Sequence, residues 1–193
     1  ITQMINGNRG ITIDGIQHPR TIFTLWTEAE RNAIGIYTVE IDESKKKDEQ
    51  WYINTNITYA FDGSKVTGSY GDAAAKAHAD TLFTAQDETD GLGTEGDVKV
   101  EGLKTQLIRT IKQQAAGILQ STDWYIVRKA DAGTAVPSAI TTHRAAVRTK
   151  CAEMETAITN AADTPALETL YTYTKQEDGS TTRPLGELPI LEA

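Results

Sequence analysis

The sequence predicts an α+β fold in which a β-rich N-terminal domain (residues 1–71) precedes a helical module (101–171) and an extended C-terminal arm (172–193). Two patterns carry this prediction. Short β-branched and aromatic runs between Asn-Gly and Asp-Gly turns fill the first part of the chain, and apolar residues at helical spacing follow residue 100. Residues 72–100 are first Ala-rich and then acidic and Gly-rich, which predicts a helix and then a linker.

The composition is that of a folded chain and limits the classes of function. Hydrophobic residues make up 39% and charged residues 24% of the 193 residues, which predicts modest cores. The net charge of −8 argues against nucleic-acid binding, because that function needs a basic surface. The single cysteine, Cys151, cannot form an intrachain disulfide, and no apolar run here is long enough to insert into a membrane.

The β-rich domain is predicted from strand-like runs between turn signals. The expected strands are 1–5, before the Asn6-Gly7 turn, and 11–13, 22–26, 36–42, 51–61 and 65–70. The Asp62-Gly63 turn should join the last two as a hairpin. Between the strands, Thr27 and Glu30 have the spacing of a capping box, which predicts a short helix that Gly35 ends.

One face of the 51–61 run collects large side chains. Alternation places four of them together: Trp51, Ile53, Tyr59 and Phe61. We expect this face to form the core of the β-rich domain, because aromatic rings on one side of a strand usually pack inward. A glycan-binding platform made of the same rings is the alternative.

The helical module is predicted as a series of capped helices. Residues 101–120 carry an apolar stripe at helical spacing: Leu103, Leu107, Ile111, Ala115, Ile118 and Leu119. A short helix follows at 124–132 and ends at Gly133, and Pro137 stands where a long helix can begin. A last short helix is expected after Asp163, and Asp178-Gly179 predicts a turn in the C-terminal arm.

Apolar residues of the long helix recur at heptad-like spacing. Ile140, Val147, Met154 and Ala161 recur every seventh residue, and Arg144, Cys151 and Ile158 lie four positions after the first three of these. Such a stripe pairs either with helices of its own chain or with further copies, as in trimeric fibres. Arg144 weakens the second option, and Cys151 is expected in the core rather than as a reactive thiol.

Residues that commonly carry chemistry are scattered along the chain. The three histidines, His18, His78 and His143, have no metal-ligand spacing and are expected at the surface. The acidic run at 87–97 lacks the calcium-loop pattern, and the GxGxxG spacing at 91–96 follows no strand. The sequence therefore predicts no catalytic, cofactor or metal site, and an enzyme is the least favoured class.

Residues 103–158 hold a specific combination of motifs. A Lys/Gln/Ala-type helix precedes TDWYIVRKADAG, a Val-Pro pair and the helix start HRAAVR. This combination resembles a domain of unassigned function in tail, tail-fibre and tail-fibre-assembly proteins of tailed bacteriophages. The residues that carry the resemblance are Thr122, Asp123, Trp124, Arg128, Lys129, Gly133, Pro137, Arg144, Ala145, Val147 and Arg148. The stretch LWTEAERNAIGIYTVE is also similar to the leading segment of marine-phage tail proteins.

The resemblance implies a non-enzymatic structural component of a phage tail, of the fibre or baseplate type, assembled in the host cytoplasm and located in the virion. Its partners would be other tail proteins and further copies, with a trimer as one option, and neither nucleic acid nor a membrane. Two alternatives stay open. One is a tail-fibre assembly chaperone absent from the finished particle, and the other is a glycan- or receptor-binding module.

Two regions are expected to join subunits, the 121–148 unit with its long helix and the C-terminal arm. Trp124 and Tyr125 are expected to anchor the short helix on its neighbours, with Trp124 buried. The arm is expected to dock on another subunit, so that deletion of 185–193 leaves folding intact. The residues assigned to these regions are Trp124, Tyr125, Arg128, Pro137, Arg144, Val147, Arg148, Met154, Leu185, Leu188 and Ile190.

Overall fold

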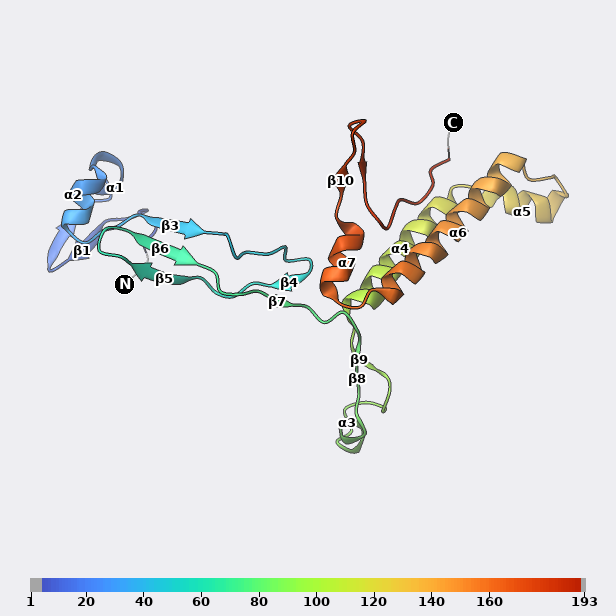
Figure 1. Cartoon of the computed structure of the whole chain (residues 1–193), viewed down its shortest axis with the longest axis horizontal. Coiled ribbons are helices and arrows are strands. Elements are labelled where there is room, and N and C mark those ends of the chain that lie inside the picture. Colours follow the sequence, from blue (N-terminus) through green and yellow to red (C-terminus); the bar gives the residue numbers. More distant parts are fainter. Residues whose placement is uncertain (1–4, 192–193) are drawn as a thin grey trace. The chain divides into compact units, whose positions relative to one another are not determined.

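A computed structural model describes residues 5–191, which form a mixed α+β fold, as the sequence predicts. The strand expected at 1–5 lies, apart from Ile5, outside the described residues. The chain divides into two compact units, residues 1–74 and 75–193 (Figure 1). The first unit has short strands and two short helices, and the second contains the long helices. Among the described residues, no helix has an apolar stretch of the length that a bilayer requires.

The first unit begins with a hairpin and two helices. β1 (Ile11–Ile13) and β2 (Ile16–His18) pair antiparallel around Asp14 and Gly15, which both have positive φ. α1 (Ile22–Leu25) and α2 (Glu28–Ala33) follow. The predicted capping box is present: Thr27 Oγ1 accepts from the Glu30 N–H, and the Glu30 carboxylate accepts from the Thr27 N–H.

The prediction of a strand at 22–26 is wrong, because α1 occupies this run. The N–H groups of Ile22 and Phe23 donate to the carbonyls of Pro19 and Arg20, which forms a helical turn directly after the proline. Ile22 is the buried residue of this helix. This single helical turn buries Ile22, so the apolar run does not need to pair as a strand in a sheet.

The main sheet of the first unit has the strand order β3-β6-β5. β3 (Val39–Asp42) runs parallel to β6 (Val66–Ser69), and β5 (Thr58–Phe61) runs antiparallel to β6. The predicted Asp62-Gly63 turn joins β5 to β6, and the Asp62 carboxylate accepts the N–H groups of Ser64 and Lys65. β4 (Tyr52–Ile53) pairs instead with β7 (Ala74–Ala75).

The aromatic face predicted along 51–61 does not exist as one surface. Trp51 is buried, whereas Ile53 is 61%, Phe61 45% and Tyr59 37% exposed. The run is split into β4 and β5, which belong to different sheets, so alternation cannot carry one face through both. Of the rings proposed for a glycan platform, Trp51 is therefore inaccessible.

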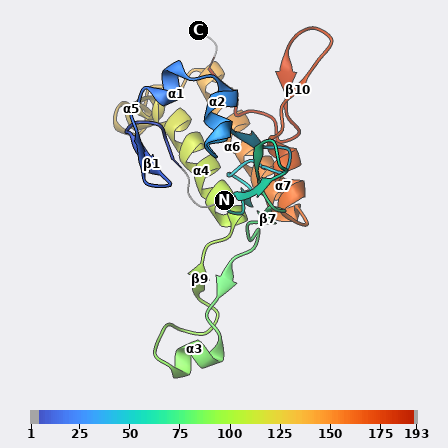
Figure 2. The same ribbon diagram turned by 90° about the vertical axis from the view of Figure 1, so that its left-hand side faces the viewer.

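The second unit is organised around two long antiparallel helices. α4 (Leu103–Gln120) and α6 (Ser138–Asn160) lie side by side in both ribbon views (Figures 1 and 2). α5 (Asp123–Ala132) forms the connection at one end, and α7 (Thr164–Tyr171) follows α6 at the other. The core of the unit contains Leu103, Ile111, Ala115, Ile140, Val147, Cys151, Met154, Ile158, Ala161, Leu167 and Leu185.

The heptad-like stripe of α6 is buried inside its own unit. Val147 and Ile158 have no exposed surface, and Met154 is 1% exposed. Lys104 Nζ at the start of α4 donates to the Thr159 carbonyl near the end of α6, which fixes the antiparallel alignment. Of the two options that the sequence leaves open, the structure has the intrachain one.

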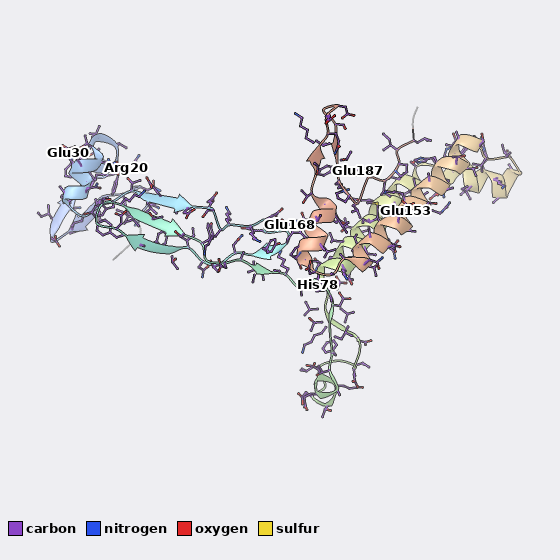
Figure 3. All side chains as sticks on the ribbon, viewed as in Figure 1. Arg20, Glu30, His78, Glu153, Glu168 and Glu187 are labelled. Atoms are coloured by element: carbon purple, nitrogen blue, oxygen red, sulfur yellow. The ribbon has the colours of Figure 1, made fainter. Side chains whose placement is uncertain are left out.

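The predicted Ala-rich helix at 72–86 is absent. Three carbonyls of this segment instead accept bonds from the helices of the second unit: Ala77 from the Leu103 N–H, His78 from the Lys104 N–H and Lys76 from the Thr164 hydroxyl. His78 thus lies beside the start of α4 (Figure 3). These carbonyls are the acceptors that a local helix would need, so tertiary bonding outweighs the helix propensity of alanine.

The predicted linker is also ordered. β8 (Thr81–Leu82) pairs antiparallel with β9 (Val98–Val100), and α3 (Ala85–Thr89) lies between them. α3 begins with a second capping box, in which the Thr84 hydroxyl and the Asp87 carboxylate accept each other's N–H groups. The acidic residues therefore hold a small hairpin together rather than solvating a flexible connection.

The C-terminal region is partly a second hairpin. β10 (Thr174–Lys175) and β11 (Thr181–Thr182) pair around the predicted Asp178-Gly179 turn. The arm then returns to the helices, where Leu185 is 2% exposed and its N–H donates to the Leu170 carbonyl. A deletion that begins at residue 185 would remove a core side chain, which contradicts the premise that it leaves folding intact.

Candidate interaction surface

Arg144 holds the corner between α4, α5 and α6 together. Its side chain is buried, and Nη1 donates to the Leu119 carbonyl and to Thr122 Oγ1, both at 2.7 Å. The same nitrogen lies 2.8 Å from Asp123 Oδ1 in the first turn of α5. One guanidinium therefore joins the end of α4, the start of α5 and the first turns of α6. The sequence analysis listed Arg144 among the residues expected to join subunits, and the structure places it in this interior connection.

α5 leaves that corner without a fully buried residue, and only Tyr125 and Arg128 are half-buried. Trp124 is 51%, Ile126 43% and Val127 65% exposed. The prediction that Trp124 is buried and anchors α5 on its neighbours is wrong. Gly133, with φ +68°, ends the helix at the predicted position.

The aromatic residues of α5 pack on one another along the helix. The ring centroids of Trp124 and Tyr125 lie 4.1 Å apart, tilted by 35°. The Arg128 guanidinium lies 4.5 Å from the centroid of the Trp124 ring and 5.5 Å from that of Tyr125. This stack restrains the large side chains in the unbound chain, which lowers the entropy that a partner must remove on binding.

The other predicted interaction residues divide between core and surface. Val147, Met154 and Leu185 are core residues of the second unit. Pro137, at the start of α6, and Arg148, within α6, are both exposed. In the arm, Leu188 is half-buried and Ile190 is 80% exposed.

The sequence did not predict the groove between α4, α6 and the arm. Its volume is about 510 Å³, and its lining consists of Gln114, Gly117, Ile118, Met154, Arg183, Glu187 and Leu188. Figure 3 labels Glu187 on the arm that borders it. The two charged groups of the groove bond to each other: Arg183 contacts both oxygens of Glu187, through Nε at 2.8 Å and Nη2 at 2.9 Å.

Two tyrosines extend this cluster. The Arg183 guanidinium lies 5.1 Å from the ring centroid of Tyr171 and 5.2 Å from that of Tyr173. The Tyr173 hydroxyl donates to Glu187 Oε1 at 2.6 Å, which raises the pKa of Tyr173. The predicted Asp178-Gly179 turn could have indicated this contact. It forms the β10–β11 hairpin, which brings Tyr173 and Arg183, the residues next to its paired ends, close together.

The histidines and the cysteine show no chemical site in the described residues. No group of three or more His, Cys, Asp and Glu side chains within 5–191 is placed to hold a metal ion. His143 is buried, which corrects the expectation that it lies at the surface. Cys151 is buried as predicted, and burial raises the pKa of its thiol, so the reactive thiolate is disfavoured.

Comparisons with family models, with curated proteins and with solved structures find no match to this chain.

Proposed function

We propose that the chain is a non-enzymatic structural component of a bacteriophage tail, a tail-fibre or baseplate-type protein that joins subunits in the virion. The observation that carries this proposal is α5, a ten-residue helix with no buried side chain and with an exposed tryptophan and valine. Exposed large apolar groups are typical of surfaces that another protein covers. α5 also lies inside the segment that resembles phage tail proteins.

The construction of the corner supports the same function. Arg144 and Thr122 fix the direction in which α5 leaves the helix pair. The stack of Arg128 on Trp124 holds the exposed ring in place. A helix that is positioned from within its own chain while its outer side stays uncovered is suited to binding a partner with little rearrangement.

Mass spectrometry of purified particles tests the proposed location. A virion component is expected at a fixed copy number relative to the other tail proteins, and it should remain after density-gradient purification. The assembly chaperone is the alternative that this experiment separates, because a chaperone would be abundant in the infected-cell lysate and absent from the particles. Absence from the particles would overturn the proposal of a virion component.

A further inference from the structure

The main sheet of the first unit has one apolar face and one polar face. Two rows of residues cross the three strands on the apolar face: Val39, Val66 and Phe61, and then Ile41, Gly68 and Tyr59. The alternate residues of the same strands form the polar face: Glu40, Asp42, Thr58, Ala60, Thr67 and Ser69. On the apolar face, Ile41, Tyr59 and Phe61 are all exposed.

β5 is an outer strand of this sheet, and its free edge presents backbone groups (Figure 1). The Asp62 N–H, directly after β5, donates to the Lys65 carbonyl at 3.2 Å. Because the bonds of an antiparallel ladder alternate, the N–H and C=O groups of Ala60 pair with β6, and those of Tyr59 and Phe61 point to the open edge. Within residues 5–191, no backbone bond from another segment reaches these outward groups.

The two outer strands differ in how they limit pairing with a further strand. Natural proteins protect open edges with charged side chains or proline. β3 contains Glu40 and Asp42, which would face like charges in a second copy of β3. β5 contains no charged residue and no proline. β5 is therefore the unprotected edge, and two copies can approach along it although each chain has a net charge of −8.

We propose that β5 pairs antiparallel with β5 of a second copy, about a two-fold axis at Ala60. In this register the outward groups of Tyr59 bond to those of Phe61 in the second copy, and the reverse, so every open group of both strands has a partner. The two rings become cross-strand neighbours, and the apolar face continues across both sheets. Asp62 lies opposite Thr58 of the second copy, so no like charges meet. The contact is isologous and closes as a dimer.

Oxidative cross-linking of cysteine variants of the full chain tests the register. Ala60→Cys places two thiols at the axis, in a non-hydrogen-bonded pair whose Cα atoms would be about 4.5 Å apart, within reach of a disulfide. Thr58→Cys is the matched control, because Thr58 is exposed on the same face of the same strand but would lie about 13 Å from its counterpart. We expect a covalent dimer from Ala60→Cys and none from the control. Cys151 is buried and common to both variants.

Charge exchange at the same position tests the contact without a covalent bond. Ala60→Lys and Ala60→Glu each place like charges opposite one another across the axis, which should raise the dissociation constant by about tenfold in sedimentation velocity. An equal mixture of the two should associate more tightly than either variant alone, because lysine then faces glutamate. Position 60 is exposed on the polar face, so both variants should fold, and circular dichroism would check this.

Three results would overturn the inference: a wild-type chain that stays monomeric at all concentrations, Ala60→Cys that cross-links no more than Thr58→Cys, or a mixture that associates no more tightly than its two components. The contact goes beyond the proposed virion function and does not depend on it. Failure of the contact leaves that function intact if the chain is found in purified particles. A cross-linked dimer of a chain that is absent from particles would support the contact and contradict the virion location.

Discussion

The α4–α6 pair and α5 are neighbours in the chain, and both were predicted as helices, but they are stabilised differently. α6 buries a continuous stripe that includes Val147, Met154 and Ile158, with none of these more than 1% exposed. α5 has no fully buried residue: Tyr125 and Arg128 are half-buried, and Arg128 stacks on Trp124 along the helix surface. The difference shows that the Arg144 corner, the Gly133 end and local stacking can define a helix that is not part of the core, which leaves its apolar groups available to a partner.

The largest expected difference between the two regions is in the free energy of unfolding. Met154→Ala should destabilise the second unit by about 2–5 kcal/mol, because it removes a buried side chain and leaves a cavity. Val127→Ala should change stability by less than ~0.5 kcal/mol, since Val127 is 65% exposed. Urea denaturation of both variants measures the contrast, and equal effects would show that α5 is part of the core.

The next largest change in stability is expected when a substitution removes the Arg144 bonds at the corner that joins the two regions. Arg144→Met should destabilise the chain by about 2–3 kcal/mol, because the Leu119 carbonyl and the Thr122 hydroxyl lose a charged donor in a buried site. Arg148→Met is the matched control, an exposed arginine on the same helix. Thermal unfolding should separate the two variants, and a corner variant as stable as the control would mean that Arg144 does not position α5.

Trp124→Ala should have a small effect on stability, about 1 kcal/mol or less, because the ring is half exposed and loses mainly its stacking with Arg128. The same change should lower incorporation of the chain into particles, as expected for an aromatic residue at the centre of an interface. Chemical denaturation measures the first effect, and quantitative mass spectrometry of purified particles measures the second. A loss of about 3–5 kcal/mol would instead indicate the buried ring that the sequence predicted.

The smallest effect concerns the β8–β9 hairpin, which like α5 depends on local interactions. Lys99 lies 2.6 Å from Asp87, and this hydrogen bond, with those from Thr84, lowers the pKa of Asp87 to about 2. Because the pKa is lowered in the folded state, the stabilisation is present above the ordinary aspartate pKa and is lost as pH falls toward 2. NMR titration should show a higher Asp87 midpoint in Lys99→Ala and an unchanged one in Lys104→Ala.

Sequence patterns predicted the elements whose signals are local. The Thr27–Glu30 capping box, the Asp62-Gly63 turn and the Gly133 helix end depend on residues within a few positions of each other, and all three are present. The stripe of α6 was predicted for a similar reason, since its period appears in the sequence. Whether that stripe packs within the chain or against another copy depended on contacts with α4. These contacts cannot be inferred from the spacing of the apolar residues in α6.

The errors arose where distant residues decide the structure. The carbonyls of Ala77 and His78 accept bonds from the start of α4, so the Ala-rich segment is extended rather than helical. Trp51 is buried as the sequence predicted, whereas Trp124, assigned to the core from the same aromatic character, is exposed. Aromatic rings favour the core and binding surfaces alike, so residue type does not distinguish the two.

Hydrogen exchange measured on the free chain and on purified particles tests the subunit-joining role of α5 most directly. We expect rapid exchange in 123–132 of the free chain and slower exchange in 123–132 of the chain in particles, with 103–120 protected in both. Exchange in 123–132 that is equally rapid in the free chain and in particles would contradict the account.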